Sequence, residues 1–542
     1  MLRSFALFSL ILLAAALQPA TSRAQDLPRL DRSSASTQLI VGGKPFLILG
    51  GELSNSVAGT AAQADDILPR MARLHINTVL MPVAWEQVET VEGTFDFTIL
   101  DHWIEQARVQ HLHLVLLWFG SWKNAVSSYT PEWVKTNPKR FARAIASDGR
   151  PLEILSTLSK ENLSADARAF QALMRHLKEF DAQQQTVLMV QVENEVGVLG
   201  SGRDHSPEAD RLFNAPLPDA LLQHLRTHGD RFSPELARAW DSKGRTWREA
   251  FGDIAPEVFM SWNYARYMGE VASSGKKEYA LPMFVNAQLP APRERAGDYP
   301  SGGPHPYFLE IYRAAAPAID FYSPDIYWPN FEYWMDRYNE HGNPAFVPEA
   351  RLEPSPFNAF YAYGEARAFG FSPFSVDSIP DPSNPANEKS ALAESFSVLE
   401  QLADLLPQAQ REGRTRGLVL HVSSPRPTQT VSLGGYLLTA ILARSWPERK
   451  ILQDDGAMIV VQTGSDEFMV AGSALTITVT KDVDAGQGIA GIVSVEEGLR
   501  TGGQWKTVRR LNGDESNQGR SISLPAHQFK LLRVKLYTSE ER

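Results

Sequence analysis

The run Val187-Leu188-Met189-Val190-Gln191-Val192 is followed directly by Glu193-Asn194-Glu195-Val196-Gly197. A short apolar run without polar alternation is typical of a strand buried on both faces, as in a parallel sheet. Similar runs recur from residue 46 to about residue 377, separated by stretches with helical periodicity. In chain order, the eight predicted strands are 46–51, 78–83, 113–118, 187–192, 283–286, 321–326, 345–348 and 371–374. Strands that alternate with helices in this way predict a closed (β/α)8 barrel, an α/β fold.

The clearest predicted helix precedes the fourth strand. Ser164 is its expected N-cap, Asp166 lies in its first turn, and the apolar residues of one face are Phe170, Leu173, Met174, Leu177 and Phe180. Residues 198–250 form a long polar insertion with helical stretches such as 219–226, and insertions at this end of a barrel commonly shape a substrate cleft. Residues 378–390 predict a surface loop before a final helix over 390–410.

After Gly417 the pattern changes to short strands separated by Gly, Asp and Asn turns. The expected strands are 419–421, 457–463, 467–471, 475–480, 489–496 and 529–536. We therefore predict a catalytic barrel over residues 25–410 and an all-β domain, sandwich-like, over residues 411–542. Two roles are open for the second domain: it binds sugar, or it covers apolar surface of the barrel. The second is favoured, since Trp505 is its one obvious aromatic platform.

The first 24 residues are typical of an export signal. Arg3 is followed by an apolar stretch from Phe5 to Leu17, and Ser22-Arg23-Ala24 is a small-x-small cleavage site. The alternative, a retained membrane anchor, needs about 20 apolar residues, more than this stretch supplies. We expect a soluble, exported chain, periplasmic or extracellular, with no membrane partner once the signal is removed. The chain has no cysteine, so it must be held together without disulfides.

The net charge excludes some partners. It is −10 for the whole chain and −12 once Arg3 and Arg23 leave with the signal. An acidic surface argues against binding to nucleic acid or to an anionic membrane. The 12 tryptophans include several close to carboxylates and amides, a mixture that suits sugar rings. A carbohydrate partner is therefore favoured, and a homodimer stays open.

Two glutamates follow predicted strands. The fourth run ends in Glu193-Asn194-Glu195, and the seventh ends in Val347-Pro348-Glu349-Ala350-Arg351. The carboxyl ends of barrel strands meet at one face, so Glu195 and Glu349 should share one cleft. Two facing carboxyl groups are the minimum equipment for hydrolysing a glycosidic bond, and no metal or cofactor is needed. The structural alternative for Glu349 is an ion pair with Arg351.

These residues resemble a known superfamily. Asn194-Glu195 and Glu349 look like the signature of retaining glycoside hydrolases with (β/α)8 barrels. Residues 191–195 resemble the acid/base motif of β-galactosidases of glycoside hydrolase family 35. Residues 85–89 (WEQVE) with 93–97 (GTFDF) are similar to a second-strand motif shared by family 35 and family 42. The resemblance implies that Glu195 is the acid/base, that Glu349 is the nucleophile and that Asn194 binds the sugar 2-hydroxyl.

The chain departs from family 35 at two places. Val196 stands where common members have Tyr, and the first strand ends in Gly50-Gly51-Glu52-Leu53 instead of a small residue and His. These differences indicate a divergent bacterial branch and leave the sugar less well defined than the mechanism.

The remaining candidates have structural alternatives. Glu52 either accepts hydrogen bonds from sugar hydroxyls or forms an ion pair at the barrel mouth. Trp118 and Trp122 either stack on a sugar ring or pack at the top of the barrel. The same two alternatives hold for Tyr327 and Trp328. Tyr327 could also donate a hydrogen bond to the nucleophile. Glu193 should point away from Asn194 by strand alternation, which favours a structural role. His305 and His341 fit no metal-binding pattern, so no metal is expected.

The sequence therefore predicts a retaining exo-β-galactosidase that acts on oligosaccharides, such as galactosylated plant cell-wall fragments of the xyloglucan type. Its expected partners are an oligosaccharide substrate and a galactose product. The alternatives are the same mechanism on a β-glucoside, a β-mannoside or an α-L-arabinopyranoside, and a non-catalytic carbohydrate-binding barrel.

Overall fold

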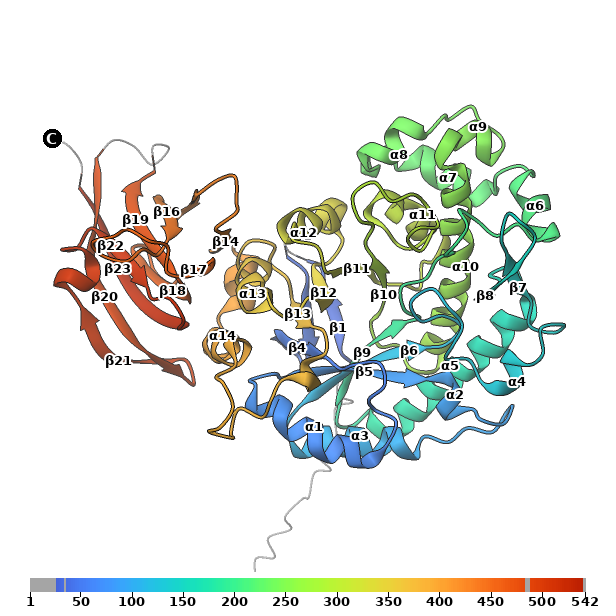
Figure 1. Cartoon of the computed structure of the whole chain (residues 1–542), viewed down its shortest axis with the longest axis horizontal. Coiled ribbons are helices and arrows are strands. Elements are labelled where there is room, and N and C mark those ends of the chain that lie inside the picture. The colour runs from blue at the N-terminus through green and yellow to red at the C-terminus, as the bar shows by residue number, and fades with distance from the viewer. Residues whose placement is uncertain (1–25, 34–35, 483–487, 540–542) are drawn as a thin grey trace, which may run out of the picture.

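The computed structural model describes residues 26–33, 36–482 and 488–539. The predicted export signal lies outside these residues. Two parts are visible in Figure 1, a barrel wrapped by helices and a β domain beside it. Among the described residues, no helix has the length and hydropathy needed to cross a bilayer.

The first part is a closed barrel of eight strands that pair in parallel, in the order β10-β11-β12-β13-β4-β5-β6-β9. The predicted (β/α)8 fold is therefore confirmed, with each predicted strand present to within a few residues. The strands are β4 (Ile48–Glu52), β5 (Thr78–Ala84), β6 (His113–Phe119), β9 (Val187–Val192), β10 (Met283–Gln288), β11 (Phe321–Ile326), β12 (Phe346–Ala350) and β13 (Gly370–Pro373).

Large apolar side chains fill the interior of the barrel at the amino-terminal ends of its strands. Phe284, Phe321, Phe346 and Phe369 pack together, with ring centroids 5.0–5.9 Å apart. A small antiparallel sheet of β1 (Arg29–Asp31), β2 (Gln38–Val41) and β3 (Lys44–Phe46) adds Leu39 to the same cluster. The interior is thus a packed core at this end, and the polar strand ends are left for the opposite face.

Helices cover the outside of the barrel. The longer ones are α1 (Ala61–Arg73), α3 (Thr98–Val109), α5 (Lys160–Asp181), α10 (Ala255–Glu278), α12 (Phe331–Asn339), α13 (Ser355–Gly364) and α14 (Ala391–Glu400). The insertion after β9 contains α6 (Pro207–Phe213), α7 (Asp219–Thr227), α8 (Pro234–Ala239) and α9 (Trp247–Phe251), as its polar, helical pattern predicted.

Two helix predictions were wrong in detail. The N-cap of α5 is Ser159, which accepts from the Asn162 backbone N–H, and Ser164 lies within the helix. The predicted final helix is broken into α14, capped by Ser390, and α15 (Leu406–Arg411). Pro407 explains the break, because proline lacks the backbone N–H and clashes with the preceding helical turn, and it is tolerated only at a helix start.

The C-terminal domain has two antiparallel sheets. One has the order β14-β17-β18-β23-β20-β21, with β14 (Thr415–His421), β17 (Asp455–Gln462), β18 (Glu467–Ser473), β23 (Lys530–Ser539), β20 (Ile489–Thr501) and β21 (Gln504–Leu511). The other comprises β15 (Thr428–Leu433), β16 (Tyr436–Leu442), β19 (Leu475–Lys481) and β22 (Ser521–Leu524). Four strands, β15, β16, β21 and β22, were not predicted. β22 is short, and β15 and β21 expose many side chains, whereas β16 is an apolar and mostly buried run that was overlooked.

The outer face of the larger sheet packs on α13 and α14. Ile459, Val461 and Met469 of this sheet belong to the same buried cluster as Phe360 of α13 and Leu399 of α14. Backbones also approach closely there, since a Cβ added to Gly364 would lie 2.8 Å from the Arg416 carbonyl oxygen, and one added to Gly417 would lie 2.4 Å from that of Phe360. The contact supports the covering role for this domain.

Candidate active site

The two predicted glutamates lie at the same end of the barrel. Glu349 is the penultimate residue of β12, and Glu195 follows β9 by three residues. Both are buried, with 4% and 3% of their surfaces exposed. Carboxylate oxygens of Glu195, Asp325 and Glu349 all lie within 4.8 Å of one another. The barrel thus brings together side chains that are 154 positions apart in sequence.

The backbone after β9 makes a sharp turn that places Glu195. Glu193 has φ 62° and Glu195 has φ 44°, both in the left-handed region that non-glycine residues seldom adopt. Two hydrogen bonds hold this turn: the Glu195 N–H donates to Asn286 Oδ1 at 3.0 Å, and the Asn194 N–H donates to the Trp122 carbonyl at 3.3 Å. Backbone strain of this kind persists only when its surroundings fix it, and it clusters at functional sites.

The environment of Glu195 favours its protonated form. Burial is the main cause that raises its pKa to about 7, the negative charge of Glu349 adds to it, and the Lys123 ammonium opposes it. Asn124 Nδ2 donates to Glu195 Oε2 at 2.8 Å and fixes the carboxyl group. A carboxylic acid with a pKa near neutrality is suited to protonating a leaving group and later to accepting a proton from water.

Glu349 is held by one strong donor. The Tyr327 hydroxyl donates to Glu349 Oε1, as the sequence had suggested for this tyrosine. Glu349 Oε2 is buried and has no hydrogen-bond partner among the described residues. Arg351 does not pair with Glu349, because its guanidinium points to Glu353 at 2.9 Å. The ion-pair alternative for Glu349 is therefore wrong.

Asp325 is a third carboxyl group that the sequence reasoning missed. It lies on β11 in register with Glu349, and Asn286 Nδ2 donates to Asp325 Oδ2 at 2.6 Å. Burial raises its pKa well above the ordinary range, with further contributions from Glu349, Glu195 and Glu52. Asn286 joins Asp325 to the backbone of Glu195. Polar residues in the carboxyl-terminal half of mainly apolar strands are the signal that could have found Asp325 and Asn286.

Glu52 and Asn194 also face this site. Glu52 ends β4, is 1% exposed, and has a pKa raised well above the ordinary range by burial, then by the charge of Glu349. Its Oε1 has no partner among the described residues, and neither has Asn194 Nδ2. Lys123 Nζ donates to Asn194 Oδ1 at 3.0 Å. Glu52 therefore forms no ion pair at the barrel mouth, and both side chains keep free polar atoms.

Trp118 and Trp122 do not form a stacking wall. Both are fully buried, so neither indole has a face open to a sugar ring. Trp118 Nε1 donates to Asp166 Oδ1 at 2.9 Å, and Trp122 Nε1 donates to the Leu155 carbonyl at 3.2 Å. The packing alternative holds for this pair. By contrast, Tyr327 and Trp328 are 36% and 37% exposed.

Glu193 has the structural role that the sequence favoured, although it lies in the left-handed turn after β9 and not within the strand. It is fully buried, and its Oε2 accepts from the Trp122 backbone N–H at 2.8 Å. Asp166 lies beside it and accepts from Trp118 Nε1, from the Ser121 N–H and Oγ, and from the Tyr267 hydroxyl. Burial, together with the charge of Asp166, raises the pKa of Glu193 well above its usual range. This pair secures the segment that carries Lys123 and Asn124 to the site.

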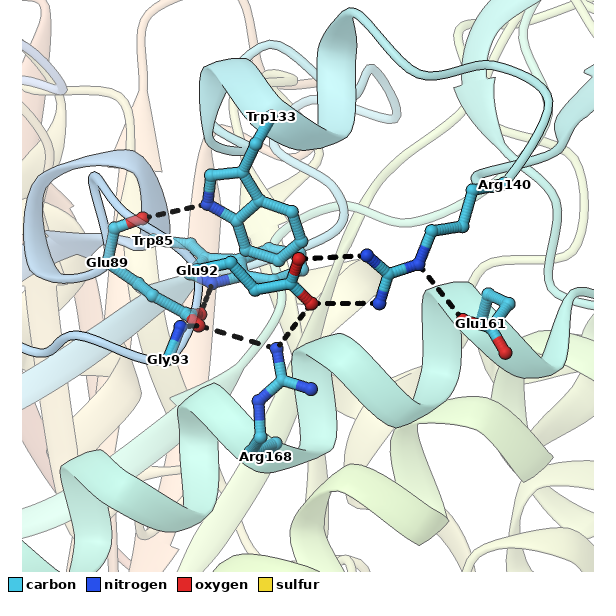
Figure 2. Close-up of polar contacts among 8 residues, drawn as sticks. All are labelled: Trp85, Glu89, Glu92, Gly93, Trp133, Arg140, Glu161 and Arg168. Atoms are coloured by element: carbon cyan, nitrogen blue, oxygen red, sulfur yellow. Dashed lines mark hydrogen bonds and ion pairs between the residues drawn. The ribbon is translucent and has the colours of Figure 1, made fainter.

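The WEQVE motif is also structural. Figure 2 shows Glu89 accepting from Trp85 Nε1 and from the Gly93 N–H, each at 2.7 Å, while Trp133 Nε1 donates to the Glu89 carbonyl at 3.1 Å. Arg168 lies 3.4 Å from Glu89, and Arg140 joins Glu92 to Glu161 of α5. These contacts tie the end of β5 to the neighbouring excursion after β6 and to α5.

Three carboxylate oxygens at this spacing are the one group in the described part of the chain that could hold a metal ion. No second observation points to an ion, and the buried Lys123 ammonium already supplies a positive charge that lowers the pKa values of Glu52 and Glu195. We assign no metal to the group.

A (β/α)8 barrel with paired glutamates at the carboxyl ends of its fourth and seventh strands defines a candidate glycosidase site. Residues 58–250 match the family model described as Beta-galactosidase, glycoside hydrolase family 42, and this match includes Glu195. Residues 392–523 match a model described as Domain of unknown function (DUF5597). The barrel and the family 42 match support a glycoside hydrolase of the β-galactosidase type, whereas family 35 is not confirmed. No curated protein matches the chain.

Solved structures with some similarity include two β-galactosidases and a β-amylase. The β-galactosidase of Bacillus circulans sp. alkalophilus is 16% identical with a TM-score of 0.45, over 67% of this chain and 57% of that one. The enzyme from Marinomonas ef1 is 14% identical with a TM-score of 0.43, over 66% and 60%. The β-amylase catalytic domain of Paenibacillus polymyxa is 12% identical with a TM-score of 0.42, over 64% and 96%. The chain thus spans less than two thirds of the length of either β-galactosidase.

Proposed function

We propose that this protein is a retaining exo-β-galactosidase with Glu195 as acid/base and Glu349 as nucleophile. The observation that carries the proposal is the separation of these carboxyl groups, whose nearest oxygens lie within 4.8 Å. Carboxyl groups about 5–5.5 Å apart suit a double displacement, whereas inverting enzymes need about 6.5–9.5 Å to admit a water molecule between them.

In the proposed reaction, Glu349 Oε2 attacks the anomeric carbon while Glu195 gives its proton to the departing glycosidic oxygen. The Tyr327 hydroxyl on Oε1 orients the nucleophile and leaves Oε2 for the attack. Once Glu349 is esterified, its negative charge is lost and the pKa of Glu195 falls. Glu195 then accepts a proton from water, which attacks the same carbon and releases galactose with retention.

The groups around the carboxyl pair supply contacts for a neutral sugar. Glu52 Oε1, Asn194 Nδ2 and Asp325 Oδ1 are buried atoms without partners among the described residues, and hydroxyl groups can satisfy donors and acceptors alike. We assign Asn194 to the 2-hydroxyl and Glu52 to a more distant hydroxyl of the same ring. Galactosylated plant cell-wall fragments are our proposed natural substrate, since an exported enzyme would meet them.

Nucleophile rescue tests this proposal. The variant Glu349→Gly should lose turnover of an aryl β-galactoside, and added azide should restore some of it by forming a galactosyl azide. The product configuration, read by NMR, should show retention in the unaltered protein. Undiminished turnover by Glu349→Gly without azide would rule out Glu349 as nucleophile, and an inverted product would rule out the mechanism. A panel of aryl glucosides, mannosides and arabinopyranosides tests the choice of sugar.

A further inference from the structure

A cavity of about 510 Å³ is lined by the segments that follow β10 and β11. One wall comes from the loop after β10, including Pro290, Tyr299 and Tyr307. The other comes from the loop after β11 and the start of α12, including Trp328, Tyr333 and Trp334. We call it the aromatic cavity. Its volume is within the range of about 300–1,000 Å³ found for pockets that enclose small ligands.

Both walls are attached to segments that carry the proposed catalytic residues. Trp328 follows Tyr327, whose hydroxyl binds Glu349, and Trp328 Nε1 donates to the Leu289 carbonyl at 3.1 Å. The opposite wall is joined to the chain just after Glu195. Val198 and Ser301 exchange two backbone hydrogen bonds of 3.0 Å, and the Gly200 N–H donates to the Gly297 carbonyl at 2.8 Å. The cavity therefore adjoins the segments after both glutamates.

The lining of the cavity has the chemistry that a neutral carbohydrate requires. Trp328 is 37% and Tyr333 46% exposed, so both side chains are accessible to a ligand in the cavity. Trp334 is buried to 4% exposure, and its indole N–H has no hydrogen-bond partner among the described residues. Arg293 and Glu294 add one charge of each sign, so the lining has no net charge to select an ionic ligand. Aromatic faces with a few polar groups at their edges suit sugar rings.

We propose that the aromatic cavity is the subsite for the aglycone, and that it binds a neutral oligosaccharide on the leaving-group side of the scissile bond. The wall formed by residues 290–301 is hydrogen-bonded to the segment after Glu195, the residue that would protonate the departing oxygen. The leaving group must lie on that side of the bond. This inference rests on the proposed function, and it adds that the enzyme prefers oligosaccharides to simple galactosides.

The test compares two substrates in the full chain, an aryl β-galactoside and a galactosylated xyloglucan oligosaccharide. The variants Tyr333→Ala and Trp328→Ala should lower kcat/KM for the oligosaccharide about tenfold more than for the aryl galactoside, as expected for the loss of one stacking contact. Trp328→Phe, which keeps a ring and avoids a large void, should lose less. Tyr537→Ala and Trp446→Ala remove exposed aromatics of the β domain and serve as matched controls.

The outcomes separate the two proposals. Equal losses on both substrates, or losses no larger than in the controls, would overturn the aglycone subsite while leaving the galactosidase proposal standing. Absence of hydrolysis of every aryl glycoside by the unaltered protein would overturn the proposed function itself. As a direct measurement, the full-length Glu349→Gln protein should bind the same oligosaccharide in calorimetry, and Tyr333→Ala in that background should weaken binding about tenfold. Unchanged affinity would count against the subsite.

Discussion

Removing the charge of Glu349 should lower the pKa of Glu195. The substitution Glu349→Gln keeps the shape of the side chain and an oxygen that can accept from Tyr327, so the main change is electrostatic. The nearest carboxyl oxygens of Glu195 and Glu349 lie within 4.8 Å of each other. Two unit charges at that distance interact by about 3.5 kcal/mol at an effective dielectric constant of 20. That energy corresponds to about 2.5 pKa units. Each charge is spread over two oxygens, which lengthens the mean separation, so we expect a fall of about one to two units.

The starting value is a pKa of about 7 for Glu195. Carbon-13 NMR of protein labelled at the glutamate carboxyl carbon can follow the titration, and subtracting the spectrum of a matching Glu195→Gln protein isolates the signal. Glu257→Gln is a suitable control, since Glu257 is a buried carboxyl in α10 that does not contribute to the pKa of Glu195. A pKa of Glu195 that stays unchanged or rises in Glu349→Gln would refute charge coupling between the two groups.

Three further predictions follow from the same cluster. Lys123→Met removes the positive charge that lowers the pKa of Glu195. The alkaline limb of the kcat/KM profile is set by loss of the proton of Glu195, so it should move to higher pH. Lys123→Arg should leave this limb in place, and a move to lower pH in Lys123→Met would contradict the role of Glu195 as the acid. Because the pKa of Glu195 is raised in the folded state, its contribution to stability is present in acid and lost as pH rises through about 7, by up to about 3 kcal/mol. Glu195→Gln should therefore unfold at higher denaturant concentration than the unaltered protein at about pH 8, with little difference at about pH 4; equal midpoints at both pH values would count against the raised pKa. Glu193→Gln keeps the size of the side chain and an oxygen that can accept from the Trp122 N–H, so kcat/KM should stay within about threefold. Asp166→Asn turns an acceptor of four donors partly into a donor, and it should cost about 1–3 kcal/mol of stability and much of the activity. A loss of activity in Glu193→Gln as large as that in Asp166→Asn would contradict the expected difference.

The barrel could be predicted because its strands are buried on both faces. Short, mainly apolar runs such as 187–192 and 321–326 match β9 and β11 to the residue, and polar residues at their carboxyl ends mark the active face. The β domain was predicted less completely, since strands such as β15 and β21 expose alternate or most side chains and give weak signals.

Within the site, the sequence could locate Glu195, Glu349 and Asn194 because each stands beside the end of a strand. It could not tell that Trp118 and Trp122 are buried, because a tryptophan at or just past the end of a strand has the same local pattern whether it packs or binds. Lys123 and Asn124 could not be found either, since their approach to Glu195 depends on how residues 120–126 fold over the barrel. Asp325 was hidden inside a run whose apolar neighbours predicted only a strand.

The close contact at Gly364 and Gly417 has a consequence for how this chain can evolve. Any side chain at either position would drive a helix of the barrel away from the first strand of the β domain. Recombination that replaced the barrel or the β domain with the corresponding part of a related protein would therefore have to keep glycine at both positions. Otherwise the whole interface between the two parts would have to repack. Loss of the β domain would leave Phe360 and Leu399 facing water, so a shortened descendant would first need polar replacements on α13 and α14. Changes on one side of this contact therefore require matching changes on the other.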